Sequence, residues 1–96
     1  MSGKLKQSDY KEIESLTNRI IWSDTKKDAA NPLRRLKFLA NTLDVQRNIS
    51  YMITELIGCA ESASGRVQQK DHWISHTKTA LYKLNAYVER EESVHD

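Results

Sequence analysis

Turn-forming residues are scarce in this chain, which has one proline and three glycines among its 96 residues. A sheet of short strands needs a turn about every 8–12 residues, so this scarcity argues against a β-rich fold. A chain of this length is expected to form one domain with one modest hydrophobic core. We therefore predict a single all-α domain over residues 1–96, a small three- to four-helix bundle that ends in an antiparallel helical hairpin.

Cysteine and long apolar runs are scarce as well. Cys59 is the only cysteine, which excludes an internal disulfide and suits a reducing compartment. Glu55 interrupts the longest apolar run, which is far shorter than the ~20 residues that cross a bilayer. The first residues, MSGKLKQSDYKE, lack the apolar stretch of a signal peptide. These features predict a soluble, cytoplasmic protein without a membrane partner.

Familiar catalytic patterns are also missing: the sequence has no glycine-rich phosphate loop and no nucleophile elbow. His72 and His76 have the helical spacing at which two imidazoles can share a metal ion, but Trp73 stands where a zinc peptidase has its glutamate. Cys59 lies among small apolar neighbours, as a buried core thiol does. We interpret the two histidines as surface residues and expect no enzymatic activity, cofactor, metal site or small-molecule substrate.

Apolar residues at helical spacing predict a first helix over about residues 8–22, with Ser8 as its N-cap. Asn31 and Pro32 indicate the start of a second helix, because proline loses no hydrogen bond at the first helical position. Residues 23–30 would then be a polar connection. The apolar stripe shifts near residues 41–44, so the segment 32–63 is either one long helix or two. The lack of glycine and proline at the shift favours one continuous helix.

A last helix is predicted over about residues 66–92, after a turn at which Gly65 takes the left-handed conformation. An apolar residue recurs every seven positions, at Val67, Ile74, Leu81 and Val88. This repeat indicates a seam with a nearly parallel neighbouring helix axis, and the short turn makes the two helices antiparallel. Residues 1–7 and 89–96 are expected to be flexible.

The most distinctive stretch, residues 48–65, is nearly uncharged, with Glu55 and Glu61 as its only charges. On a helical wheel, its apolar side chains cover most of the circumference, so other helices or a second chain must surround it. Gly58 costs about 1 kcal/mol relative to alanine inside a helix, which close packing of another backbone would offset. We predict that this segment is a core seam or a partner-binding seam formed by Ile49, Met52, Ile53, Leu56, Ile57 and Ala60.

A basic cluster precedes this segment and contains Lys26, Lys27, Arg34, Arg35 and Lys37, with Asp28 as the one acidic residue between them. Cations near the start of a helix oppose its dipole, which suggests that they serve to bind phosphate or acidic side chains. Trp22, a few residues upstream, could stack on an unpaired base. The simpler interpretation is a solvated face, because the net charge is only +2 and lysine and arginine commonly pair with nearby carboxylates.

These features together predict a small helical protein–protein interaction module. It would be an adaptor, an assembly factor or an inhibitor that occupies a partner's surface. The partner is another protein, a second copy in a homodimer, or both. The alternative is a dimeric nucleic-acid-binding regulator that contacts backbone phosphates through the basic cluster.

Overall fold

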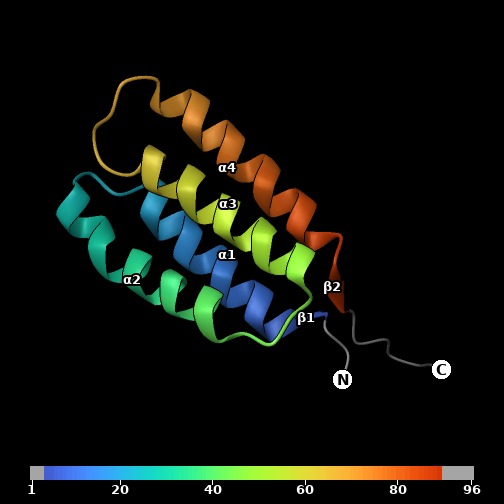
Figure 1. Cartoon of the computed structure of the whole chain (residues 1–96). Coiled ribbons are helices and arrows are strands. Elements are labelled where there is room, and N and C mark those ends of the chain that lie inside the picture. The colour runs from blue at the N-terminus through green and yellow to red at the C-terminus, as the bar shows by residue number, and fades with distance from the viewer. Residues whose placement is uncertain (1–3, 90–96) are drawn as a thin grey trace.

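The computed structural model describes residues 4–89 and contains four helices within that range (Figure 1). They are α1 (Gln7–Ile21), α2 (Lys26–Thr42), α3 (Arg47–Ala63) and α4 (Lys70–Asn85). Two short strands, β1 (Leu5–Lys6) and β2 (Val88–Glu89), pair in parallel. The predicted all-α bundle is confirmed, and α3 and α4 lie side by side in antiparallel directions as a helical hairpin (Figure 1).

Helix α3 is the centre of the bundle and packs against α1, α2 and α4. In Figure 1 it lies between α4 on one side and the α1–α2 pair on the other. The burial of its apolar residues explains this position, because a helix with so broad an apolar face needs several neighbours. Its fully or nearly fully buried side chains are Ile49, Ile53, Leu56, Ile57, Ala60 and Ala63.

The start of the chain contributes to the core, contrary to the expectation for residues 1–7. Leu5 is fully buried, and it pairs with Val88 in the two-stranded ladder. The last helix also ends earlier than predicted, at Asn85, and Val88–Glu89 continues as a strand beside Leu5–Lys6. This pairing joins two segments far apart in sequence. Residues 1–3 and 90–96, the remaining parts of the segments expected to be flexible, lie outside the described residues.

Helix α2 begins at Lys26, so the prediction that it starts at Pro32 is wrong. Thr25 is the N-cap, and its Oγ1 accepts a hydrogen bond from the backbone N–H of Asp28 at 3.0 Å. The Asp28 carboxylate lies in the first turn, where its negative charge interacts favourably with the helix dipole. Pro32 therefore lies inside the helix, where it lacks the N–H that would bond to the Asp28 carbonyl. The cap at Thr25 and the burial of Ala29 stabilise the longer helix despite this loss.

The segment 32–63 is interrupted, so the prediction of one continuous helix is also wrong. Helix α2 ends at Thr42, and Leu43 has extended backbone angles of φ −70° and ψ 135°. Leu43 and Val45 are half-buried and pack against the core. The chain thus reverses without glycine or proline, because burial of two apolar side chains in the connection stabilises the break.

The connection between α3 and α4 is longer than predicted, because α4 begins at Lys70 rather than near residue 66. Gly65 has a φ of 72°, which confirms its predicted left-handed conformation. A Cβ at this position would lie 3.1 Å from the backbone nitrogen of Lys26, so a larger residue would also crowd the start of α2. Val67 falls in this connection, while Ile74 and Leu81 lie buried on the seam.

A Thr17→Val substitution is expected to raise the free energy of unfolding by about 1 kcal/mol. Thr17 is fully buried in α1, and its Oγ1 has no hydrogen-bond partner among the described residues. Valine has nearly the same shape and removes the hydroxyl that burial leaves without a partner. Urea denaturation of the two proteins measures the change. A loss of stability would mean that the hydroxyl is hydrogen-bonded in solution.

Candidate functional site

A groove of about 420 Å³ runs between α3 and α4. Its apolar part consists of half-buried side chains from both helices, with Met52 and Cys59 from α3 and Trp73 and Ala80 from α4. A concave surface with apolar and aromatic side chains is the usual setting for ligand or partner binding. The remaining lining residues are polar or lack a side chain: Glu55, Gly58, Ser62, His76, Thr79 and Lys83.

The two edges of the groove carry opposite charges. Glu55 is exposed on the α3 edge, and Lys83 is exposed on the α4 edge, where His76 also lies. Within residues 4–89, neither Glu55 nor Lys83 forms an ion pair. The groove therefore has one acidic and one basic edge, and both charges face solvent.

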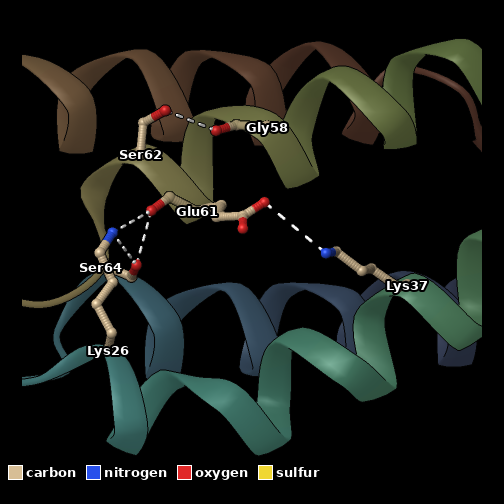
Figure 2. A network of polar contacts seen from close by, with 6 residues as sticks. All are labelled: Lys26, Lys37, Gly58, Glu61, Ser62 and Ser64. Carbon is tan, nitrogen blue, oxygen red and sulfur yellow. Dashed lines mark hydrogen bonds and ion pairs between the residues drawn. The ribbon is translucent and has the colours of Figure 1, made fainter.

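Gly58 lies on the α3 edge of the groove and is exposed. A Cβ built at this position would meet no atom within 4 Å, so the close packing predicted around Gly58 does not occur within the described residues. Its backbone is helical, and its carbonyl accepts a hydrogen bond from Ser62 Oγ at 3.0 Å (Figure 2). Neither backbone conformation nor internal packing requires glycine here.

Replacement of Gly58 by alanine is expected to stabilise the protein by about 0.5–1 kcal/mol, because alanine restricts the unfolded chain and favours the helix. The new methyl group has free space in the described structure. Thermal or urea unfolding tests this, with Gly65→Ala as the contrasting variant, since position 65 has a positive φ and a close backbone neighbour. A destabilised Gly58→Ala protein would contradict the open environment of this residue.

The thiol of Cys59 is held in its less reactive form. Burial raises its pKa above the ordinary value, and the negative charge of Glu55 raises it further. A raised pKa lowers the fraction of nucleophilic thiolate at neutral pH. Cys59, a half-buried residue, thus behaves as an apolar lining residue of the groove.

The two histidines predicted as surface residues are exposed on α4, with ring centroids 4.4 Å apart. Trp73 lies between them in sequence, and its ring meets the His72 ring edge-on and the His76 ring at a tilted angle. Among residues 4–89, no group of three or more histidine, cysteine, aspartate or glutamate side chains is arranged to hold a metal ion.

The basic cluster does not form one continuous surface, because its members point in different directions from α2. Lys26 Nζ donates hydrogen bonds to the Glu61 carbonyl at 3.1 Å and to Ser64 Oγ at 2.9 Å (Figure 2). Lys37 Nζ lies 3.9 Å from the Glu61 carboxylate (Figure 2). These two lysines therefore interact with the C-terminal end of α3, where positive charges interact favourably with the helix dipole.

The other members of the cluster face α1 or solvent. Arg35 Nε donates a hydrogen bond to Glu12 Oε2 on α1 at 2.8 Å, and its guanidinium lies over the Phe38 ring. Arg34 bonds to Asn31 of its own helix, and Lys27 is exposed. Phe38, 54% exposed, is an aromatic surface residue that sequence reasoning missed. It lies outside the apolar stripe of this helix, which indicated an outward direction; the stripe consists of Leu33, Leu36, Leu39, Ala40 and Leu43.

The apolar residues predicted as a core or partner seam are mostly core. Five of them are buried inside the single chain, and Met52 is half-buried and lines the groove. The position of Trp73 and Ala80 beside Met52 and Cys59 depends on how α3 and α4 pack. No periodicity within one helix indicates such a groove.

Comparison with models of protein families gave no match, and neither curated proteins nor solved structures gave a significant match. None of the helices in residues 4–89 combines the length and apolar character needed to cross a membrane.

Proposed function

We propose that this chain is a small helical protein–protein interaction module, an adaptor, assembly factor or inhibitor, that binds its partner through the α3–α4 groove. The observation that carries the proposal is the exposed Gly58 beside the half-buried apolar side chains of the groove. Glycine at this helical position lowers stability, and nothing inside the described chain benefits from it. A partner backbone that approaches α3 closely would benefit, since the missing Cβ leaves space beside the groove.

The groove residues are consistent with a protein partner rather than a reaction. Met52 and Trp73 are side-chain types enriched at protein interfaces, and charged residues remain at the edges, as they do around interface cores. Cys59 is not activated as a nucleophile, because its pKa is raised. The proposal thus assigns the groove to contact, without a chemical step.

Affinity capture with matched variants tests the proposed function. Gly58→Trp fills the groove edge and is expected to preserve folding, because position 58 has open space around it. The control Ser15→Trp adds the same side chain at an exposed position of α1 outside the groove. Proteins from native extract that bind the unmodified chain and Ser15→Trp, but not Gly58→Trp, are the expected result. Equal capture by all three proteins would contradict groove binding.

The second candidate function is binding of single-stranded nucleic acid along α2. Phe38 favours it, because an exposed ring with the Arg35 guanidinium over it offers a stacking surface and an adjacent cation. The expected affinity for a single-stranded oligonucleotide falls with salt by a log–log slope of about 0.7 per phosphate contact. Loss of this binding in Phe38→Ala, but not in Tyr82→Ala, would support it. Unmeasurable binding at low salt would refute it.

A further inference from the structure

We infer that the groove binds a second copy of this chain, in a two-fold dimer whose axis runs along the groove. This inference rests on the proposed function and names its partner. The argument depends on the charges at the two edges, on the geometry of a two-fold contact and on the size of the face.

The edges of the groove are complementary to each other. Glu55 lies on the α3 edge, and Lys83 and His76 lie on the α4 edge. A partner that fits both edges must present a basic side chain to α3 and an acidic one to α4. The same face of a second copy carries both, because its own α4 edge is basic and its own α3 edge is acidic.

Two-fold symmetry restricts how the copies can meet. In an isologous contact, if one residue of the first copy touches a second residue of the partner, then that second residue of the first copy touches the first residue of the partner. An axis along the groove places α3 of one copy over α4 of the other, so the acidic edge of each copy lies over the basic edge of its partner. An axis across the groove would place α3 over α3 and α4 over α4, so edges of like charge would meet, which electrostatic repulsion disfavours. The charges therefore select the first arrangement.

The remaining groove residues suit this contact. The half-buried side chains of Met52, Cys59 and Trp73 would meet their equivalents near the axis and lose their remaining contact with water. Gly58 allows α4 of the second copy to approach α3 without a clash, because its Cα carries no side chain and the space above it is open. The glycine that the isolated chain does not need thus has a use in the dimer.

The size of the face predicts a weak dimer. Helix α3 has 17 residues, which corresponds to a length of about 25 Å, and two adjacent helices are about 20 Å wide. Such a face covers roughly 500 Å² per copy, below the roughly 800 Å² of a standard stable interface. We expect a dissociation constant in the micromolar range, so the dimer forms or dissociates with protein concentration.

Sedimentation-velocity ultracentrifugation of the untagged chain, from about 1 µM to about 500 µM, tests the inference across the micromolar range. The expected result is a reversible monomer–dimer equilibrium. Glu55→Lys and Lys83→Glu each should raise Kd about ten-fold or more, because each replaces two attractive pairs with two repulsive ones. The double variant Glu55→Lys with Lys83→Glu should recover most of the affinity. Lys11→Glu, an exposed change on α1, serves as the matched control.

A second readout uses the single thiol of the chain. The alkylation rate of Cys59 should fall at least several-fold between the lowest and highest protein concentrations, because the dimer covers the groove. Circular dichroism of each variant establishes that its helices are intact.

Three outcomes would overturn the inference. They are a monomer at every concentration, a dimer whose Kd is insensitive to both charge changes, or a double variant no tighter than the single ones. Each would leave the proposed function separately testable. That proposal fails only if Gly58→Trp captures the same proteins as the unmodified chain, whereas the dimer fails by sedimentation alone.

Discussion

A Leu5→Ala substitution is expected to lower the free energy of unfolding by about 2–5 kcal/mol. Leu5 has no solvent exposure and lies in the main core cluster, although it lies between two lysines near the start of the chain. Alanine removes most of the apolar area that Leu5 buries and leaves a cavity that only partial relaxation can fill. Because a domain of this size is marginally stable, such a loss is a large fraction of the total.

Urea denaturation followed by circular dichroism measures this effect. The adjacent Lys6→Ala is a matched control, since Lys6 is exposed in the same strand and its replacement should change stability by less than about 0.5 kcal/mol. If Leu5→Ala proved as mild as the control, the pairing of β1 with β2 would not anchor the first residues to the core. The measurement therefore distinguishes a packed N-terminal segment from the flexible one that the sequence predicts.

A Lys70→Met substitution is expected to cost about 2–3 kcal/mol, because hydrogen bonds to a charged group contribute about 1.5–3 kcal/mol and their loss leaves carbonyl groups without a donor. The half-buried Lys70 Nζ donates to the carbonyl oxygens of Ala63 and Gly65, the latter at 2.6 Å. It also lies 3.5 Å from the Ser23 carbonyl oxygen. One ammonium group thus joins the end of α3, its following turn and the α1–α2 connection.

Methionine keeps most of the apolar stem and removes only the charge and its hydrogen bonds, which isolates the polar contribution. Lys11→Met on the exposed face of α1 is the control and should change stability by less than about 0.5 kcal/mol. Equal stabilities for the two variants in urea would show that water replaces Lys70 at these carbonyls without loss. The network around Lys70 would then not hold the two connections together.

Local signals in the sequence were sufficient for the helical class, the first helix and the left-handed Gly65. The first helix was predicted within one residue of α1 at each end, because its apolar period lies within the helix itself. The predicted N-cap is wrong, since Lys6 occupies that position without a side-chain hydrogen bond and Ser8 lies inside the helix. The neutral segment 48–65 indicated a helix surrounded by neighbours, because its apolar side chains cover most of the helix circumference. Scarce glycine and proline excluded a β-rich fold before any packing was known.

The start of α2 shows where two local signals compete. Asn31 with Pro32 and Thr25 with Asp28 are both acceptable helix starts. The start at Thr25 lengthens the helix, and Ala29 in the added part is buried. A start at Pro32 would leave Ala29 in a loop. The choice depends on packing against the rest of the bundle, which local capping rules do not include.

The amino-acid sequence by itself determined that this chain forms amphipathic helices with a central apolar one, since helical periodicity and capping act over a few residues. Only the tertiary structure decided that the chain breaks at Leu43, that Leu5 enters the core and that the basic cluster disperses over three directions. It also placed Met52 and Cys59 beside Trp73 to form the groove. These features depend on which helix faces lie side by side, and that arrangement results from burying all the apolar faces at once.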